Sequence, residues 1–334
     1  MKHTILFILI LLLFSCCEKI MFEEDLQTDD PHKNFDYLWT ECDEKYSFFD
    51  YKNIDWNTIR NKYRPMISKD MSDDSLFNVM AAMLNELKDD HANLFSNFNV
   101  SHFGNYRKGQ DNFDWRIIVD HYLPEDYYVT GPFRHGYITD SIGYIRFSAF
   151  SGKVNTSNLN FVINKYKNTR GLIFDIRENG GGSISEVYSI LSRFIDEKTL
   201  LYYSRIKTGP GHNEFSELEP ISIQPSTEAR YNKKVICLAD RGAYSASSFM
   251  ALGVRAISNI TLMGDTTGGG LGVPNGGQLP NGWRYRFSIT QTFDKEGKNY
   301  EAGVPPEAHA LFNWNDLSTD EVLEAAIDTI KQSN

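Results

Sequence analysis

Apolar side chains recur every three or four positions in the N-terminal part of the chain. The repeat is clearest over residues 76–87, directly after the capping-prone sequence Ser72-Asp73-Asp74, and weaker over residues 35–42. A shorter piece with the same spacing lies between them, at residues 56–63. Because this spacing puts the apolar residues on one face of an α-helix, it predicts a helical N-terminal domain over residues 32–94.

After this domain the pattern changes to strands that alternate with helices. Residues 95–142 are polar, aromatic and punctuated by glycine, which predicts a connector of loops and short strands. Apolar or alternating runs predict the later strands, at 143–148, 171–177, 201–206, 235–239, 260–263 and 283–293. The alternation of strands and helices predicts an α/β core of stacked β/α units over residues 143–334.

Local signals predict where some of these elements begin. Pro280-Asn281-Gly282 is a hairpin turn signal before the last alternating run. Ser183 with Glu186, and Ser318 with Glu321, have the spacing of capping boxes, in which a serine and a glutamate bond to each other's backbone at the start of a helix. We therefore expect one helix from about residue 183 and another at the C-terminus.

The first residues have the layout of an export signal. The apolar run Ile5–Phe14 is too short to span a bilayer. Cys16 follows it in a sequence similar to the lipobox of bacterial lipoproteins, in which the cysteine is acylated. We expect a lipoprotein signal peptide (1–16), an acidic tether (17–31) and a lipid-anchored protein of the bacterial cell envelope, periplasmic or at the outer surface. An ordinary signal peptide or a short anchor is the alternative.

The composition narrows the function further. The chain has 334 residues and a net charge of −10, which argues against a nucleic-acid surface. Cys42 and Cys237 remain beyond the leader, with Cys17 beside the anchor, and a disulfide between Cys42 and Cys237 is open in an oxidising compartment. No spacing of cysteine and histidine suggests zinc, so we expect no metal and no cofactor.

Ser245 has the setting of a nucleophile. The apolar run 235–239 passes through a glycine-containing turn and delivers this serine to the start of a predicted helix, whose N–H groups favour negative charge. The glycine run Gly180-Gly181-Gly182 is a second candidate for the same pocket. No Gly-Lys-Ser/Thr follows it, which excludes a P-loop, although a plain tight turn stays open. Together these segments suggest an acyl-transfer site with its own oxyanion hole.

A serine nucleophile needs a base, and His91 has the most suggestive setting among the eight histidines. It follows a predicted helix, in Asp89-Asp90-His91, where Asp90 or a distant carboxylate could hold its tautomer. A histidine favoured there only by the helix dipole is the alternative. Asp175 and Arg177 could form a structural ion pair. The glycine cluster at 264–272 either walls the pocket of Ser245 or is a plain loop.

Four segments, 171–182, 239–248, 264–270 and 301–307, resemble in their order the tail-specific (C-terminal processing) protease family. The resemblance covers about residues 140–330. It implies a ClpP/crotonase-like fold and a serine peptidase that acts on peptides or unfolded proteins. It implies Ser245 as nucleophile, an oxyanion hole from the N–H groups of Ala246 and of a glycine such as Gly180 or Gly181, and a substrate-binding wall. That wall comprises Gly268, Gly269 and Gly270.

The base differs from that of the better-known branch, which uses a Ser–Lys dyad. Gly270 stands where the resemblance would place the lysine, and no lysine occurs between Lys234 and Lys295. The glycine-rich segment instead resembles the branch of tricorn protease and interphotoreceptor retinoid-binding protein. In tricorn-like enzymes a histidine is the base and a later glutamate completes the relay, which His91 and Glu301 match. Asp90 occupies the position of a relay serine.

Two further expectations follow from the resemblance. Many relatives insert a PDZ domain before the core, but the stretch between His91 and Gly143 has no such pattern, so none is expected. The retinoid-binding branch shows that the scaffold also binds ligands without proteolysis. A catalytically inactive protein that binds a peptide or an apolar ligand is therefore the alternative function, and the oligomeric state stays open.

Overall fold

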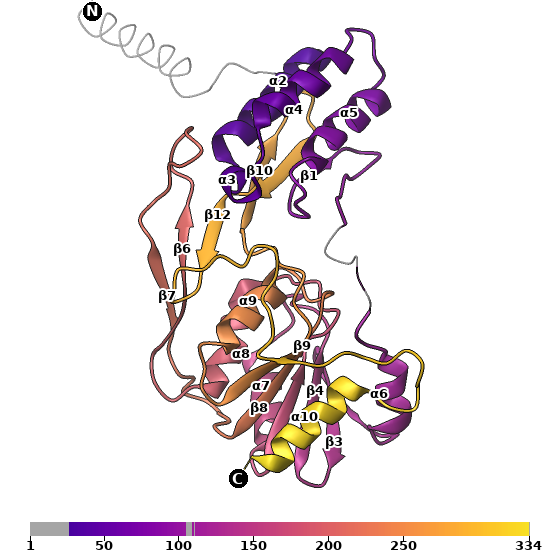
Figure 1. The fold of residues 1–334 in the computed structure, drawn as a ribbon, viewed down its shortest axis with the longest axis vertical. Helices are drawn as coiled ribbons and strands as arrows, with labels where there is room; N and C mark the ends of the chain where they lie inside the picture. Colours follow the sequence, from indigo (N-terminus) through magenta and orange to yellow (C-terminus); the bar gives the residue numbers. More distant parts are fainter. Residues whose placement is uncertain (1–26, 105–108, 110, 334) are drawn as a thin grey trace, which may run out of the picture.

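The computed structural model describes residues 27–104, 109 and 111–333. Helices from the start of the chain gather at one end of the molecule, and a large sheet lies at the other (Figure 1). The N-terminal helices are α2 (Pro31–Lys45), α3 (Phe49–Lys52), α4 (Trp56–Tyr63) and α5 (Asp73–Asn85), followed by strand β1 (Asn93–Phe95). The helices predicted from the apolar spacing are confirmed. The leader with Cys16 lies outside the described residues.

Capping side chains explain where these helices start. Asp30 caps α2 by accepting the N–H groups of His32 and Lys33, and Pro31 occupies the first turn, where its missing N–H costs nothing. Ser72 caps α5 by accepting the N–H of Ser75, as its sequence position predicts.

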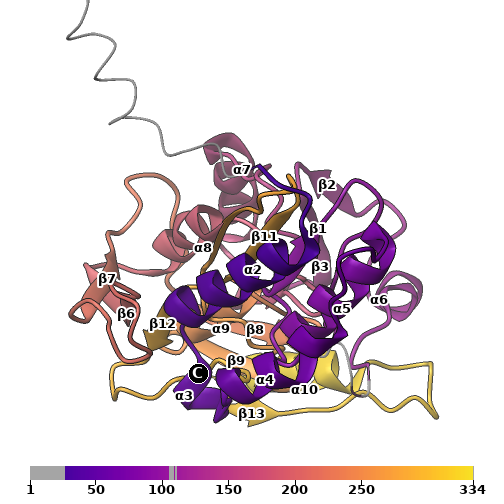
Figure 2. The same ribbon diagram turned by 90° about the horizontal axis from the view of Figure 1, so that it is seen from above.

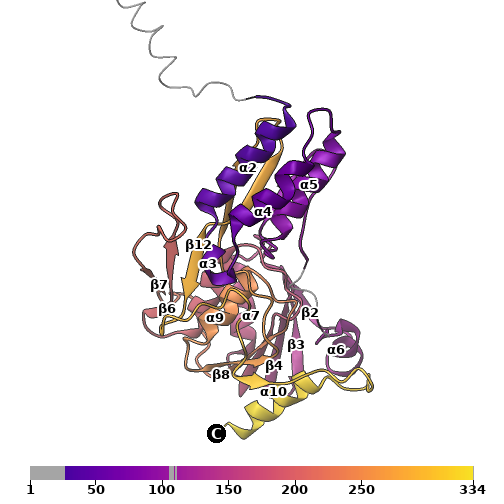
Figure 3. The same ribbon diagram turned by 45° about the horizontal axis from the view of Figure 1, so that its top comes forward.

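The N-terminal helices share a core with a hairpin from far along the chain. Strands β10 (Pro274–Gln278) and β11 (Arg284–Ser288) pair around the predicted turn, and β1 adds to β11 in an antiparallel three-stranded sheet. Leu279, Trp283 and Phe287 pack into one apolar cluster with α2 and α5. Figure 3 shows these helices together at one end of the molecule, away from α10. A hairpin of residues 274–288 therefore completes the core of the N-terminal lobe.

A seven-stranded sheet forms the second lobe and confirms the predicted β/α units. Its order is β13-β9-β8-β5-β4-β3-β2, with parallel pairing from β13 to β4 and antiparallel pairing from β4 to β2. In chain order the strands are β2 (Tyr128–Thr130), β3 (Phe133–Thr139), β4 (Ile142–Phe147), β5 (Gly171–Asp175), β8 (Lys234–Ala239), β9 (Ile260–Gly264) and β13 (Ala308–His309).

Helices cover both faces of this sheet, because successive residues of each strand point to opposite sides. Leu172 and Phe174 pack with α7 (Thr156–Tyr166), α8 (Ile184–Leu191) and α9 (Ala246–Val254). Ile173 packs on the other face with α6 (Trp115–His121) and α10 (Glu321–Gln332). Figure 2 shows α7 and α8 on the opposite side of the strands from α10.

A third, antiparallel sheet runs along the side of the molecule between the two lobes (Figure 1). Its strands are β12 (Thr290–Phe293), β6 (Thr199–Ile206) and β7 (Glu219–Ile223). Because β12 continues directly from β11, it leads the chain from the N-terminal lobe back toward the core. Among the described residues, the segment between β1 and β4 holds α6, β2 and β3 and no PDZ domain, as expected.

Several local predictions are corrected. Ser183 precedes α8 but makes no side-chain cap, and Glu186 instead accepts the N–H of Val154 at 2.6 Å. The last helix is capped by Asp320, not by the predicted pair of Ser318 and Glu321. Helix α6 was not expected in the connector. In both predicted boxes the glutamate instead accepts a backbone N–H from another segment, Glu186 from Val154 and Glu321 from Asn313 at 2.9 Å.

The open question of a disulfide is settled for Cys42 and Cys237, which are both free and buried. Cys42 belongs to the core of the N-terminal lobe and Cys237 to the core of the large sheet. The predicted pair of Asp175 and Arg177 is confirmed and extends to Asp320, with Arg177 Nη2 at 2.7 Å and 2.9 Å from the two carboxylates. This fully buried network fixes the end of β5, just before the glycine run. No helix in the described part of the chain has the length and apolarity to cross a membrane.

Candidate active site

Ser245 stands on a strained turn between strand β8 and helix α9. Its backbone has φ 57° and ψ −120°, a region that residues with a Cβ rarely adopt. The turn is held from behind, because the N–H of Ser245 donates to Gly269 O at 2.9 Å and the N–H of Tyr244 donates to Asn179 O at 3.0 Å. The predicted strand-to-helix turn is therefore present, and it aims the hydroxyl into a cleft.

His91 meets this hydroxyl although 154 positions separate the two residues. Its Nε2 lies 3.0 Å from Ser245 Oγ. The imidazole comes from the segment between α5 and β1, is 5% exposed and packs against the ring of Tyr244, with centroids 5.0 Å apart. Burial lowers the pKa of His91, although the charge of Asp89 opposes the shift. A neutral imidazole at neutral pH is the form that accepts a proton.

The other predicted relay residues do not contact the imidazole. Glu301 is buried, and its Oε2 accepts the N–H groups of Leu271 (2.7 Å) and Gly272 (3.0 Å). Asp90 accepts the N–H of Gly104. Among the described residues His91 Nδ1 is buried without a hydrogen-bond partner, although the backbone of Gly272 favours the charged ring. The expected direct hydrogen bond from His91 to Glu301 or Asp90 is absent, because both carboxylates hold loop backbone instead.

Asp89 is the carboxylate that sequence reasoning missed. Its Oδ1 accepts the N–H of His91 at 2.8 Å, and its Oδ2 accepts the hydroxyls of Tyr46 (2.9 Å) and Ser288 (3.0 Å). Lys52 Nζ lies 3.5 Å from the same oxygen. The sequence places Asp89 and Asp90 side by side, and only the fold turns the first inward and the second toward Gly104.

The glycine run and the start of α9 offer N–H groups beside Ser245. Gly180 lines the cleft, and within the described residues its N–H and that of Ala246 donate to no other group. The N–H of Gly181, the other glycine expected in the oxyanion hole, instead donates to Asn179 Oδ1 at 3.0 Å. A Cβ on Gly181 would lie 2.8 Å from Ser245 Cβ, so only glycine lets the run approach the serine this closely. Asn179, which sequence reasoning missed, therefore orients the run.

The predicted substrate-binding glycines lie behind the serine. Gly268 donates its N–H to Ala243 O at 2.7 Å, Gly269 accepts from Ser245, and Gly270 donates to Glu301 O at 3.0 Å. These contacts brace the serine turn. Gly268 and Gly270 line the neighbouring cavity on the side of Lys52, whereas Gly272 to Pro274 line the cleft of Ser245. The cluster at 264–272 thus supports the serine turn through these hydrogen bonds, and its last residue, Gly272, lines the cleft.

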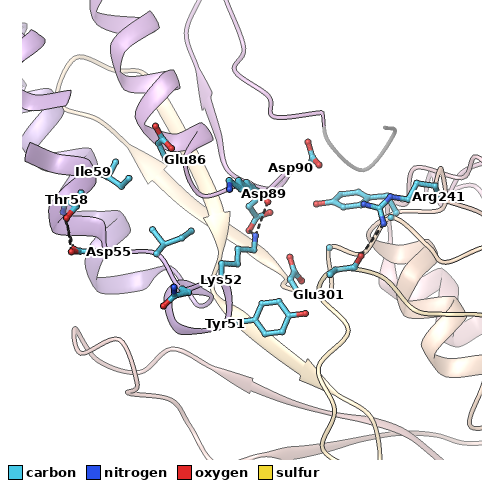
Figure 4. A pocket seen from close by; sticks show the side chains of 17 residues that line it. Tyr51, Lys52, Asp55, Thr58, Ile59, Glu86, Asp89, Asp90, Arg241 and Glu301 are labelled. Carbon is cyan, nitrogen blue, oxygen red and sulfur yellow. Dashed lines mark hydrogen bonds and ion pairs between the residues drawn. The ribbon is translucent and has the colours of Figure 1, made fainter. Parts of the chain in front are cut away.

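Two cavities meet at Tyr244 and Asp90, which line both. The cleft of Ser245 and His91 has a volume of about 750 Å³, and its apolar lining includes Phe95, Ile184 and Phe249. Arg286 adds a cation to this cleft. The second cavity, of about 570 Å³, lies on the side of Lys52, Asp89 and Glu301 (Figure 4). Among the described residues no group of three His, Cys, Asp or Glu side chains could hold a metal ion.

This arrangement has the parts of nucleophilic acyl transfer. A hydroxyl is hydrogen-bonded to a buried neutral base, and in the described part of the chain the N–H groups of Gly180 and Ala246 have no other acceptor.

Comparison with family models gives two matches. The model described as peptidase family S41 matches residues 141–310, and the model described as the tricorn protease C1 domain matches residues 27–85.

The proteins that resemble the chain include two solved structures and one bacterial protease. The crystal structure of a candidate peptidase from Parabacteroides merdae ATCC 43184 is 35% identical, with a TM-score of 0.86 over 92% of this chain and 98% of that one. Carboxy-terminal processing protease CtpA from Bacillus subtilis (strain 168) is 25% identical over 174 residues, which are 51% of this chain and 35% of CtpA, about a third of that relative's length. Mature CPAF is 14% identical, with a TM-score of 0.68 over 90% of this chain and 96% of that one, and shows the fold alone.

Proposed function

Because the chain belongs to peptidase family S41, we propose that it hydrolyses peptide bonds with Ser245 as the nucleophile and His91 as the general base. This family agrees with the tail-specific protease resemblance of the four sequence segments. The observation that carries the proposal is the 3.0 Å distance between Ser245 Oγ and His91 Nε2. A tail-specific serine peptidase of the tricorn-like kind fits both family matches.

In the proposed reaction Ser245 Oγ attacks the scissile carbonyl carbon while its proton passes to His91 Nε2. The carbonyl oxygen becomes an oxyanion, and the N–H groups of Gly180 and Ala246 stabilise it. His91 then donates its proton to the leaving amine as the C–N bond breaks. A water molecule, deprotonated by the same imidazole, hydrolyses the acyl ester and restores the serine.

Two predicted relay residues act through the backbone in this proposal. Glu301 holds the N–H groups of Leu271 and Gly272, and Gly272 lines the cleft beside His91. Glu301 is a positioning residue there. Asp90 holds Gly104 at the rim of the cleft.

The lining of the cleft supports a polypeptide substrate. Ile184, Phe249 and Val273 offer apolar surface beside Ser245, which suits an apolar side chain next to the scissile bond. Arg286 suits a carboxylate of the substrate. We further propose that the protein works in the bacterial cell envelope, held to a membrane by acylated Cys16. Replacing this residue (Cys16→Ser) should then release the protein from the membrane fraction of cells.

The test of the function removes the two central side chains. Ser245→Ala and His91→Ala should each lower peptide turnover by on the order of 10⁶-fold, with circular dichroism unchanged. A fluorophosphonate probe should label the parent chain at Ser245. Equal turnover in parent and Ser245→Ala would refute the proposal. A folded parent that is not labelled, and that binds a peptide or apolar ligand intact, would establish the inactive binding protein instead.

A further inference from the structure

Three separate segments of the N-terminal lobe converge on the Asp89 carboxylate. Tyr46, at the end of α2, and Ser288, at the end of β11, donate hydroxyl hydrogen bonds to Oδ2 at 2.9 and 3.0 Å. Lys52 closes α3, and its Nζ lies 3.5 Å from the same oxygen. Figure 4 shows the Lys52 side chain reaching across the second cavity to Asp89. The remaining oxygen, Oδ1, accepts the N–H of His91 at 2.8 Å.

This geometry fixes the main chain of the base. Asp89 has no exposed side-chain surface, so its hydrogen bonds do not compete with water. A carboxylate that accepts several hydrogen bonds in a buried site cannot turn without leaving donors unsatisfied. The peptide of His91 is therefore tied to α2, α3 and β11 through one side chain.

The two buried carboxyl groups of this site, Asp89 and Glu301, differ in how readily they ionise. Burial works against ionisation of Asp89, but Lys52, His91 and the hydrogen-bond donors outweigh it and lower its pKa. Burial and the nearby charge of Asp89 raise the pKa of Glu301 to about 8. Both backbone bonds of Glu301 go to Oε2, which leaves Oε1 for a proton. Asp89 is therefore the more readily ionised of the two carboxyl groups, and burial beside that charge favours the protonated form of Glu301.

The other charged groups around His91 lie in the open cleft, whereas Asp89 is buried. Arg286 and Asp90 both act on the imidazole, with opposite sign. Both line the open cleft, where solvent screens them. The charge of Asp89 is buried and permanently directed at the base.

We propose that Asp89 is the positioning residue of the catalytic histidine, which fixes its backbone and supplies the negative charge that stabilises the imidazolium formed when Ser245 loses its proton. Two residues thus share the role expected of Glu301 in the relay. Glu301 holds the backbone of the cleft wall, and Asp89 supplies the negative charge beside the imidazole. Since Asp89 and His91 belong to the N-terminal lobe and Ser245 stands on the large sheet's side, proton transfer depends on the docking of that lobe. The proposal rests on the proposed peptidase function.

The decisive variant is Asp89→Asn, which keeps the size and one acceptor but removes the charge. In the Ser245→Ala background, histidine-labelled protein is titrated by NMR, and the signal of His91 is assigned by its loss in His91→Gln. The pKa of His91 should fall by about one unit on Asp89→Asn, within the range that a nearby charge produces. In the active chain, the acid limb of kcat/KM should move to lower pH, and the plateau kcat should fall about tenfold.

Asp320→Asn is the matched control. Asp320 is also a buried aspartate that accepts a backbone N–H, from Leu323, and pairs with a buried cation, Arg177. Its substitution should lower stability while the pKa of His91 and the pH profile stay unchanged. Lys52→Met is the second test. It removes the cation that does most to keep the buried Asp89 carboxyl ionised, so the charge beside the imidazole changes and the pKa of His91 should shift in this variant too.

The role of Asp89 and the proposed peptidase function are tested by different measurements. An unchanged pKa of His91 in Asp89→Asn, or in Lys52→Met if the former does not fold, overturns the role of Asp89, whatever happens to kcat. If the parent chain cleaves no peptide and resists the fluorophosphonate probe, the proposed function fails. The NMR titration still measures the coupling between Asp89 and His91, because it does not depend on turnover.

Discussion

The backbone of Ser245 gives a prediction about the cost of placing a side chain on this turn. With φ 57° and ψ −120°, the residue adopts a conformation that glycine reaches freely and other residues do not. Ser245→Gly and Ser245→Ala both delete the hydroxyl and its hydrogen bond to His91. They differ only in the Cβ, so the difference between their free energies of unfolding isolates the backbone strain.

The magnitude follows from two opposing contributions. A non-glycine residue in such a conformation costs about 1–3 kcal/mol. Glycine loses more chain entropy on folding, which costs roughly 0.5–1 kcal/mol relative to alanine. The glycine variant should therefore be more stable than the alanine variant, by up to about 2.5 kcal/mol, the reverse of the usual order.

Urea unfolding followed by circular dichroism measures both variants, and neither should digest itself because both lack the nucleophile. Ser189 supplies the control pair, because it is exposed within helix α8 and has no positive φ. There alanine should exceed glycine by about 1 kcal/mol. If alanine were also the more stable residue at position 245, the inference that the serine turn stores strain would be wrong.

Three further predictions concern the buried network, the glycine run and the base. Asp320→Ala leaves buried Arg177 short of a partner and should destabilise the fold by about 3–5 kcal/mol, measured by urea unfolding; a loss below about 1 kcal/mol would contradict a buried ion network. Gly181→Ala places a Cβ 2.6 Å from Tyr244 O and 2.8 Å from Ser245 Cβ, and should lower kcat on the order of 10²-fold in steady-state assays; an unchanged kcat would show that the run does not position the serine. Burial lowers the pKa of His91 below the usual histidine value of 6.5, so the imidazole stays neutral to lower pH. The acid limb of kcat/KM should therefore have its midpoint below pH 6.5, and a midpoint at pH 7 or above would contradict this.

The parts of the fold and site that the sequence predicted are those that neighbouring residues determine. A strand-to-helix turn with a serine, and a glycine run after a buried strand, are backbone conformations that nearby residues impose, so the sequence located both parts around Ser245 and Gly180. The apolar spacing of α5 and the buried run of β8 likewise follow from periodicity. His91 was identified by its place after a helix and by resemblance, because no spacing along the chain relates it to Ser245.

The neighbours Asp89 and Asp90 show where this reasoning stops. Both carry the same carboxylate one residue apart, and the resemblance favoured Asp90 and Glu301 for the relay. Packing of α2, α3 and β11 decided that Asp89 faces Tyr46, Lys52 and Ser288. The sequence by itself determined the conformations of the nucleophile turn and the glycine run, since these depend on adjacent residues. Tertiary structure alone decided which carboxylate stays charged beside the base, since burial and the placement of a distant cation depend on segments that meet only in the folded chain.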